Sequence, residues 1–281
     1  MRRIPPKGFK VILSGSEESS LPGERSFACA QDDRGSYMTV SIITVCFNSE
    51  KTLKRAMESV LEQTVPPLEY IIIDGLSTDK TVEIAESFKE KFSEKGTELK
   101  IFSEKDNGIY DAMNKGIDKA RGDIIGIINS DDYYEKEAVE VMTDTFEKTG
   151  CDLAFADIRM HMTNGRTFVK KAKVRKYTTS RDWNHPTQFV SRKVYDRFHF
   201  RCRDISDDMD FYFRVKKAGY RIVAVNKVLA DFMMGGVSNR IPAREILPRI
   251  KRRYRIYREN GFSRFYIFEC VAFELIKYVF A

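Results

Sequence analysis

The sequence lacks any run of about 18 uncharged apolar residues, so it predicts no ordinary membrane-spanning helix. Its five cysteines include no CxxC or other close pair, and its three histidines are scattered, so no zinc cluster of the usual spacing is expected. An odd, scattered set of cysteines is typical of reduced thiols in a cytoplasmic protein. The sequence contains neither GxGxxG after its first strand nor GxxxxGKS/T anywhere, which excludes the phosphate loops of dinucleotide-binding proteins and P-loop NTPases.

The positive charge lies almost entirely at the C-terminal end. The chain of 281 residues has 48 Lys and Arg against 41 Asp and Glu, a net charge of +7. Residues 240–281 contain ten of the basic residues and four Glu, which accounts for +6 and leaves the rest of the chain at +1. A basic protein first suggests nucleic acid or an anionic membrane as partner, but here the body of the chain is nearly neutral.

Residues 1–37 differ from the rest and are predicted to be a disordered extension. The stretch SGSEESSLPGE at 14–24 is polar, rich in Ser, Gly and Glu, and has no periodicity. Such a composition cannot bury enough apolar surface to fold alone. Val11-Ile-Leu is too short for the apolar part of a secretory signal. Because Met38 stands directly before the first strong strand, we expect it to be the native start.

From Met38 onwards, strand and helix patterns alternate. Strand-like apolar runs fall at 40–45, 70–73, 100–103, 123–128, 152–156 and 166–170, with helical spacing at 49–63, 78–92, 109–120 and 135–149. Repeated strand–helix–strand units with buried strands predict an α/β fold, in which helices flank a mostly parallel, doubly wound sheet. Ligands of such sheets bind at the carboxyl ends of the strands.

Polar side chains gather at those strand ends. Asn48 follows the first strand, Asp74 the second, Asp106 the third, and Asp131 with Asp132 the fourth. Two adjacent carboxylates repel each other unless they share a cation, so this pair predicts a site for a hard divalent ion. The alternative is an N-cap for the helix at 135–149. The segment that begins at Asp74 has a similar alternative, a turn followed by a helix cap at Ser77 or Thr78.

A third group of polar residues lies on one turn of the helix predicted at 109–120. Asp111, Asn114 and Lys115 face the same strand-end crevice. Three polar groups on that face are unusual for a plain amphipathic helix, which favours a functional role.

Taken in order, these motifs resemble the family 2 glycosyltransferases, which have the Rossmann-like GT-A fold of nucleotide-sugar enzymes. The matching segments are VCFN at 45–48, DGLSTDKT at 74–81, GIYDAMNKGI at 108–117, RGD at 121–123, NSDD at 129–132 and ISDDMDFYFR at 205–214. The GIYDAMNKG string is similar to the subgroup that builds exopolysaccharide, O-antigen, colanic acid or capsule. The resemblance implies a GT-A domain at 38–238, followed by a helical tail at 239–281.

The resemblance also implies roles for these residues. Asp132 would bind Mg²⁺ or Mn²⁺, and Asp208 would be the catalytic base of an inverting mechanism, which takes the proton of the attacking acceptor hydroxyl. Asp207 is the rival base and also a plausible helix cap. The implied donor-binding residues are Val45, Phe47, Asn48, Asp74, Ser77, Asp111, Asn114, Lys115 and Asp131.

One position departs from the family pattern. Many members have a second aspartate after the second strand, which can read the donor base, and here that position is Gly75. A UDP-sugar is the default donor, with dTDP and GDP as alternatives. On the acceptor side, His185 is a candidate for substrate contact or a structural histidine. Trp183 could stack on a sugar face or belong to the core.

The C-terminal tail has its own pattern. Ile246, Ile250, Tyr254 and Tyr257 recur at helical spacing among arginines, and Gly261 ends this basic amphipathic helix. We expect residues 244–281 to bind an anionic membrane surface and to keep the enzyme peripheral on the inner, cytoplasmic face of the plasma membrane. The alternatives are packing on the catalytic domain and a dimer contact.

The sequence therefore predicts an inverting, metal-dependent glycosyltransferase. It would move a sugar from a nucleotide-sugar donor to a saccharide or polyprenol-linked saccharide acceptor in cell-surface polysaccharide synthesis. A nucleotidyltransferase that makes the donor would need a Gly-rich basic loop where this chain has Cys46-Phe-Asn-Ser. A non-catalytic sugar-nucleotide-binding homologue is disfavoured because the acidic set is present. No nucleic acid is expected, since a carboxylate-lined crevice repels phosphate without a metal.

Overall fold

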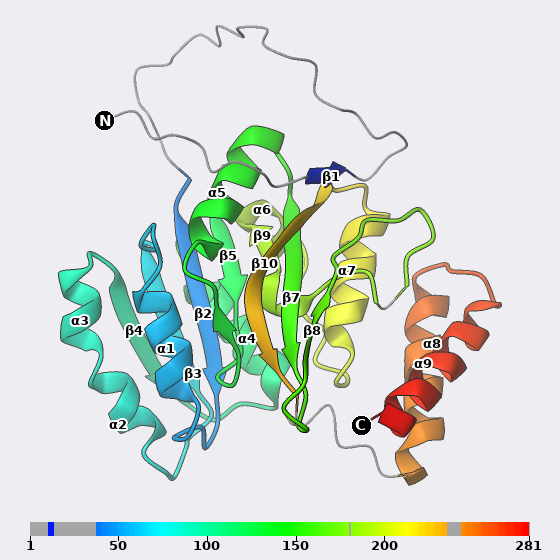
Figure 1. The fold of residues 1–281 in the computed structure, drawn as a ribbon, viewed down its shortest axis with the longest axis horizontal. Coiled ribbons are helices and arrows are strands. Elements are labelled where there is room, and N and C mark those ends of the chain that lie inside the picture. The colour runs from blue at the N-terminus through cyan, green and yellow to red at the C-terminus, as the bar shows by residue number, and fades with distance from the viewer. Residues whose placement is uncertain (1–10, 14–37, 180, 235–242, 281) are drawn as a thin grey trace, which may run out of the picture.

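The computed structural model describes residues 11–13, 38–179, 181–234 and 243–280, which form one sheet with helices on both faces (Figure 1). The strands of this part of the chain are β1 Val11–Leu13, β2 Val40–Cys46, β3 Glu69–Asp74, β4 Glu98–Ser103, β5 Ile124–Ile127, β6 Tyr133–Tyr134, β7 Leu153–His161, β8 Thr167–Lys170, β9 Phe189–Ser191 and β10 Ile222–Met233. Their order across the sheet is β1-β10-β7-β9-β5-β2-β3-β4, with β6 paired to β10 and β8 to β7.

The sheet is mixed. Neighbouring strands run parallel through β4, β3, β2 and β5 in turn and between β7 and β10. Strand β9 lies antiparallel between β5 and β7, and β1, β6 and β8 also pair antiparallel. Strands β2, β3 and β5 are buried along their whole length. That suits apolar, β-branched strands with helices on both sides. The predicted α/β fold with flanking helices is confirmed, and its parallel part is β4-β3-β2-β5 within a mixed sheet. The pattern does not reveal the direction of β9, because a three-residue strand carries no direction signal.

Two hydrophobic clusters fill the space on either side of the sheet. Successive residues of β2 alternate between them, with Ile42 in one and Ile43 in the other. One face is covered by α1 Leu53–Leu61, α2 Thr81–Glu86, α3 Lys89–Glu94 and α5 Ala138–Thr149. The other is covered by α4 Ile109–Lys119, α6 Arg192–Tyr195, α7 Asp207–Lys217, α8 Ile246–Glu259 and α9 Tyr266–Phe280. Gly116 lets α4 lie close to β2, since a Cβ there would come within 2.6 Å of Ile43.

The single helix predicted at 78–92 is two helices, α2 and α3. Between them, the Ser87 hydroxyl donates to the Ile84 carbonyl at 2.7 Å, and the Phe88 amide donates to the Ala85 carbonyl at 3.2 Å. These bonds to the third residue back tighten the turn, and serine hydroxyls compete with the helical backbone in this way. Phe88 is buried at the break.

The C-terminal helices pack on α7, which is the arrangement expected from the packing alternative. The ring of Phe213 on α7 lies 5.0 Å from Tyr257 and 4.6 Å from Phe262. Ion pairs join Arg255 to Asp204 at 3.1 Å and Arg203 to Glu259 at 2.7 Å. No helix in the described part of the chain has both the length and the hydropathy to cross a bilayer.

At the other end of the chain, β1 pairs antiparallel with β10 at the edge of the sheet, with Val11 opposite Val225. Apart from β1, the predicted extension 1–37 lies outside the described residues. The predicted boundary near 238 also lies outside them, within 235–242. The proposed start at Met38 stays a prediction.

Candidate functional site

The loops that follow β2 and β3 are bound to each other at the carboxyl edge of the sheet. Asn48 has a positive φ of 49°, a backbone conformation that asparagine tolerates better than most residues. Its amide donates to the Ser77 hydroxyl at 2.8 Å, and its side-chain Oδ1 accepts from the Thr78 amide at 2.9 Å. Asn48 and Ser77 thus form a cross-brace between two segments predicted to bind the donor.

Asp74 anchors the second of these loops. Its buried carboxylate accepts from the Ser103 hydroxyl at 2.7 Å, from the Ser77 amide at 3.0 Å and from the Ser77 hydroxyl. The turn expected as an alternative is therefore present. The Cys46 thiol also donates to Oδ1 at 3.8 Å, so these bonds occupy the roughly four acceptor positions of the carboxylate. The predicted donor contact of Asp74 stays open.

Gly75 is crowded by groups from two other segments. A Cβ on Gly75 would lie 2.6 Å from Oδ2 of Asp106 and 3.4 Å from the ring of Phe47. A carboxylate from the loop after β4 thus lies where many family members carry their second aspartate. Phe47 is 63% exposed, whereas the Val45 side chain is buried in the core, so a donor contact of Val45 would come from its backbone.

The Asp131–Asp132 pair has the electrostatics of a site that favours a cation. Asp132 is 1% exposed, and its Oδ1 accepts from the Met233 amide at 3.0 Å. Burial first, and the charge of Asp131 second, raise the pKa of Asp132 well above its usual range. Burial also raises the pKa of Asp131. Within the described residues, no Lys or Arg pairs with either carboxylate, and Oδ1 of the neighbouring Asn129 is buried without a partner.

These residues fit a hard divalent cation. It would supply the missing positive charge and take carboxylate oxygen, with diphosphate and water as its other ligands. The described residues contain no cluster of three His, Cys, Asp or Glu side chains that could hold a metal alone. The capping alternative is wrong, because α5 begins at Ala138 and its N-cap position is Glu137.

A second group of site residues lies where α4 and α7 begin. The Tyr110 hydroxyl, on the first turn of α4, is 3.2 Å from Oδ1 of Asp208 and 3.0 Å from the Ile205 carbonyl. Burial first, and the charge of Asp208 second, raise the pKa of Tyr110, so its hydroxyl stays a donor. Because α4 starts just after β4, this contact brings Asp208 to the carboxyl edge of the sheet.

Asp207 and Asp208 differ in their access to solvent. Asp207 is 1% exposed, and its Oδ2 accepts from the Arg203 amide at 2.6 Å. Burial first, with the charges of Asp204 and Asp210, raises the pKa of Asp207. Asp208 is only half-buried. An acceptor hydroxyl can therefore reach Asp208 more readily than Asp207.

Of the two acceptor-side candidates, His185 lies near Asp208 and Trp183 lies in the core. Burial lowers the pKa of His185, and the charge of Asp208 opposes that shift. Both ring nitrogens of His185 are buried without a partner among the described residues. Trp183 is 5% exposed and stacks on Tyr212 at 4.7 Å, so the structure favours its core alternative.

The polar residues of α4 bind neighbouring backbone. Asn114 donates to the Phe200 carbonyl at 2.8 Å and accepts from the Phe200 amide at 3.0 Å. Asp111 accepts from the Asn107 amide at 2.9 Å, and Lys115 donates to the Lys105 carbonyl at 2.6 Å. These contacts hold the segments on either side of the crevice, and a donor-binding role for the three residues stays a prediction.

Sequence reasoning missed two residues of the site. The sequence shows Asp106 as a polar residue at a strand end but predicts no role for it, and Tyr110 lies within the GIYDAMNKG string. What identifies them is their partners, Gly75 and Asp208, which the sequence does not reveal.

Comparisons with known proteins agree with this architecture. Residues 41–206 match the family model described as glycosyl transferase family 2. The chain is 30% identical over 223 residues to a PGL/p-HBAD biosynthesis glycosyltransferase of Mycobacterium tuberculosis, which covers 77% of this chain and 85% of that protein. It is 24% identical over 226 residues to TuaG of Bacillus subtilis, a putative teichuronic acid biosynthesis glycosyltransferase, which covers 78% of this chain and 87% of that protein.

Two solved structures have a similar fold. TarS of S. aureus in complex with UDP-GlcNAc has a TM-score of 0.63 at 18% sequence identity, covering 85% of this chain and 72% of that chain. The mannosyltransferase PcManGT of Pyrobaculum calidifontis, in complex with GDP-Man and Mn²⁺, has a TM-score of 0.56 at 16% identity, covering 78% of this chain and 62% of that chain.

Proposed function

The chain belongs to glycosyltransferase family 2, and we propose that it inverts the anomeric carbon of a nucleotide-sugar donor in a metal-dependent transfer to an acceptor hydroxyl. The observation that carries the proposal is the pair of acidic centres. One is the pair of Asp131 and the buried Asp132, which has no cationic partner among the described residues, and the other is the more accessible Asp208, which accepts a hydrogen bond from Tyr110.

Asp208 is the proposed general base. It would take the proton of the acceptor hydroxyl as that oxygen attacks the anomeric carbon from the side opposite the leaving diphosphate. Tyr110 would hold one carboxylate oxygen in place, which leaves the other oxygen for the acceptor. His185 feels the charge of Asp208, and its two ring nitrogens have no partner in the part of the chain that the structure describes, so it is the proposed acceptor-side contact.

Asp132 is the proposed metal ligand, with Asp131 beside the donor ribose. A Mg²⁺ or Mn²⁺ ion bound there supplies positive charge that stabilises the departing nucleoside diphosphate. The Met233 amide would keep the Asp132 carboxylate in one orientation. The buried, unpaired state of Asp132 supports this role, because a carboxylate with a raised pKa gains most from a cation.

The donor base is proposed to lie between Phe47, Asp74 and Asp106. An exposed aromatic ring can stack on the base, and a carboxylate accepts the single ring N–H of uracil. A UDP-sugar is therefore the first choice, and the UDP-GlcNAc bound to TarS is consistent with it. dTDP shares the same N–H edge, whereas GDP would need room for a purine.

The acceptor is proposed to be a saccharide, free or linked to a polyprenol lipid, in cell-surface polysaccharide synthesis. The names of the mycobacterial and Bacillus relatives point to cell-envelope glycans. A lipid-linked acceptor lies in the membrane, so we propose that the enzyme works peripherally on its cytoplasmic face. The exposed apolar side chains of α9 support this location.

A donor screen tests the proposal. Purified enzyme is incubated with UDP-, dTDP- and GDP-sugars, Mg²⁺ or Mn²⁺, and membranes from a polysaccharide-producing host, and nucleoside diphosphate release is followed. We expect release with one donor class, loss of release with EDTA, and an inverted anomeric configuration in the product. Retention of configuration, or full activity in EDTA, would contradict the mechanism.

A further inference from the structure

Three of the six cations of α8 form ion pairs with carboxylates of the protein. Arg252 pairs with Glu245 at 3.3 Å, and Arg253 pairs with the buried Glu274 of α9 at 3.0 Å. Arg255 pairs with Asp204 at 3.1 Å. A charge already matched by a carboxylate adds little attraction to an anionic partner. These three arginines therefore contribute little to binding of an anionic partner.

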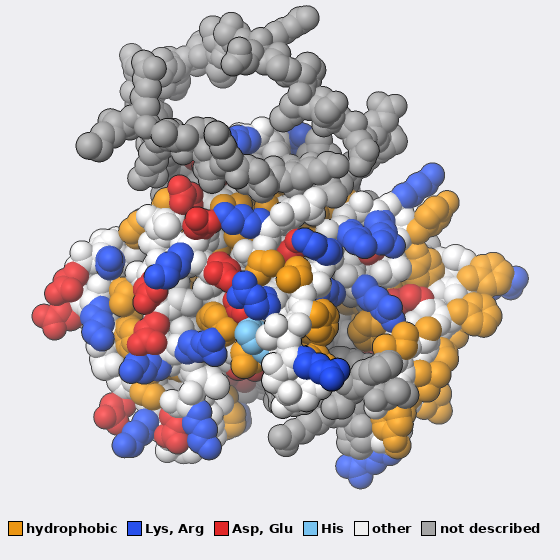
Figure 2. All heavy atoms as spheres, in the orientation of Figure 1, with side chains coloured by type: hydrophobic (Ala, Val, Ile, Leu, Met, Phe, Trp, Pro, Cys, Tyr) orange, Lys and Arg blue, Asp and Glu red, His pale blue; other side chains and the backbone are white. Residues whose placement is uncertain are grey.

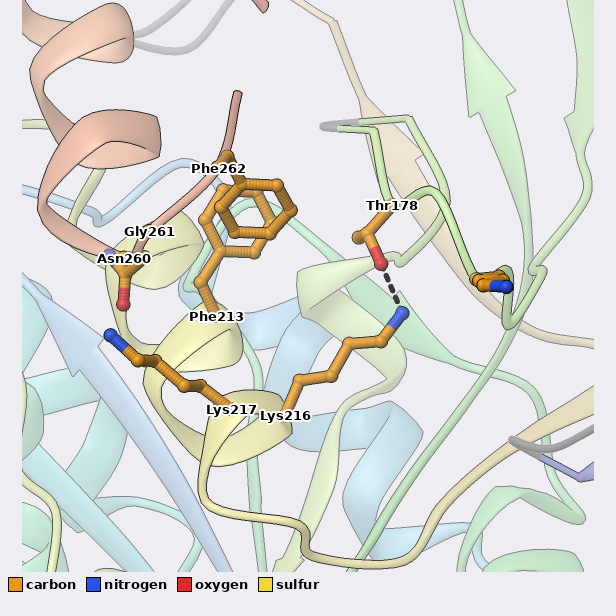
Figure 3. A pocket seen from close by; sticks show the side chains of 8 residues that line it. Thr178, Phe213, Lys216, Lys217, Asn260, Gly261 and Phe262 are labelled. Atoms are coloured by element: carbon orange, nitrogen blue, oxygen red, sulfur yellow. Dashed lines mark hydrogen bonds between the residues drawn. The ribbon is translucent and has the colours of Figure 1, made fainter. Parts of the chain in front are cut away.

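Three lysines beside the tail have no such match. Lys176, Lys216 and Lys217 line a hollow of about 170 Å³ between the end of α7 and the turn from α8 to α9. No ion pair within 4 Å joins any of them to a carboxylate of the described residues. Figure 3 shows Lys216 and Lys217 leaving the last turn of α7 toward opposite sides of this hollow, and the rings of Phe213 and Phe262 lie in contact beside it, tilted by 41°.

Lys216 is the most enclosed of the three. Its ammonium donates to the Thr178 hydroxyl and to the Arg175 carbonyl, two of its three possible hydrogen bonds. Burial lowers the pKa of Lys216, and the charge of Asp182 offsets only part of that effect. An anion in the hollow would add to the partial counter-charge that Asp182 provides.

An exposed apolar edge continues directly from this hollow. Phe262 forms part of its wall, and Phe265 and Phe268, in the next two turns, are 64% and 70% exposed. Farther along α9, Leu275 and Tyr278 are also exposed. Figure 2 shows hydrophobic side chains gathered at the right-hand edge, where α8 and α9 lie in Figure 1. Apolar side chains beside unpaired lysines are typical of surfaces that enter the headgroup region of a membrane.

We propose that this hollow, the lysine pocket, binds the phosphate of an anionic phospholipid while the aromatic edge of α9 enters the membrane interface. This proposal rests on the peripheral membrane location that is part of the proposed function. It identifies the lysine pocket and the aromatic edge of α9 as the surface that contacts the membrane. Lys217 lies nine residues after Asp208 on α7, about 14 Å along a helix that rises 1.5 Å per residue. The lysine pocket is thus separate from the proposed catalytic groups.

The test is co-sedimentation of the full chain with vesicles. Vesicles of phosphatidylcholine alone are compared with vesicles that also contain phosphatidylglycerol. We expect binding to the anionic vesicles, and at least about a tenfold loss of partitioning in K176Q/K217Q. The matched control, K91Q/K95Q, removes the same charge from α3 on the other face of the sheet and should bind like the wild type. F265S/F268S should reduce binding to the anionic vesicles as well.

Several outcomes would overturn the proposal. They are equal losses in the pocket and control variants, binding that ignores lipid charge, inorganic phosphate binding without vesicle binding, and a dimer through α9 in place of vesicle binding. Donor hydrolysis without vesicles keeps the two proposals apart. K176Q/K217Q should retain it, whereas D208N should lose it and still bind vesicles.

Discussion

At the residue scale, the environment of the Asp132 carboxylate lowers the stability of the metal-free protein and at the same time favours the binding of a cation. Its side chain is buried, and the charge of Asp131 adds to the unfavourable free energy of ionising it. In the unfolded chain an aspartate has a pKa near 3.9. Because the folded pKa is raised, the folded state loses stability as the pH rises through the interval between the two values. A bound cation would remove this effect.

The substitution Asp132→Asn tests that conflict. The amide keeps an oxygen for the Met233 amide and removes the buried charge. In EDTA at pH 8 we expect a higher melting temperature than for the wild type, by about 2–4 °C for each kcal/mol recovered. The difference should vanish on acidification, as the wild-type carboxyl takes up its proton.

Manganese provides the control in the same thermal melts. It should raise the melting temperature of the wild type and leave Asp132→Asn unchanged. Destabilisation of Asp132→Asn at pH 8 would contradict the assignment, as would equal stabilisation of both proteins by manganese.

Tyr110 is expected to position Asp208. Tyr110→Phe removes the hydroxyl 3.2 Å from Oδ1 of Asp208 and keeps the ring that packs on Phe200. We expect kcat to fall about ten- to a hundredfold, since one hydrogen bond to a charged group is lost, with an unchanged donor KM. Steady-state kinetics measure both. Tyr220→Phe, which changes a phenol outside the site, should leave kcat alone, and an effect on donor KM only would refute the positioning role.

Asp106 is expected to contribute to binding of the donor base. Asp106→Asn should raise the KM for the donor about tenfold and leave kcat nearly unchanged, because the contact is made equally in the ground state and the transition state. The matched control is Asp144→Asn on α5. A fall in kcat with constant KM would assign Asp106 to the chemical step instead.

At the element scale, the tail is part of the folded domain. Tyr257 of α8 is fully buried against Phe213, Phe262 and Tyr266. The repeat of Ile246, Ile250, Tyr254 and Tyr257 predicted an amphipathic helix, but the pattern does not say which surface its apolar face covers. In the structure the apolar face of α8 packs against α7, and part of α9 stays exposed.

The substitution Tyr257→Ala measures how firmly the tail is docked. Loss of a fully buried aromatic side chain should lower the free energy of unfolding by about 3 kcal/mol or more, read from urea titration. Tyr278→Ala, on the exposed side of α9, should change it by less than about 0.5 kcal/mol. Equal effects in the two variants would mean that α8 is not part of the cooperative domain.

The sequence predicts the elements better than their contacts. Buried strands and strand-end carboxylates follow from local patterns, so the sheet and the positions of Asp74, Asp131 and Asp132 could be anticipated. The contact of Asn114 with Phe200 spans 86 positions, and the one between Tyr110 and Asp208 spans 98. No local sequence pattern predicts these two contacts, because they form only when α4 packs against α7 and the segment that precedes α7.

At the scale of the whole molecule, the two faces of the sheet carry different parts of the protein. The face with α4, α7, α8 and α9 carries Tyr110, Asp208 and the tail, and the opposite face carries α1, α2, α3 and α5. The carboxyl edge joins them, because loops after β2, β3, β4 and β5 meet there. The net charge of +7 at first suggested nucleic acid, whereas in the structure three arginines of the tail pair with the carboxylates of Glu245, Glu274 and Asp204.

The most direct test of the central claim compares two neighbouring carboxylates in one transferase assay with saturating donor and Mn²⁺. If Asp208 is the base, Asp208→Asn should lower kcat by about 10²–10⁴. Asp207→Asn should lower kcat less than tenfold, because its buried carboxylate is bound to the Arg203 amide. Near-wild-type turnover by Asp208→Asn, with the large loss in Asp207→Asn, would contradict the account.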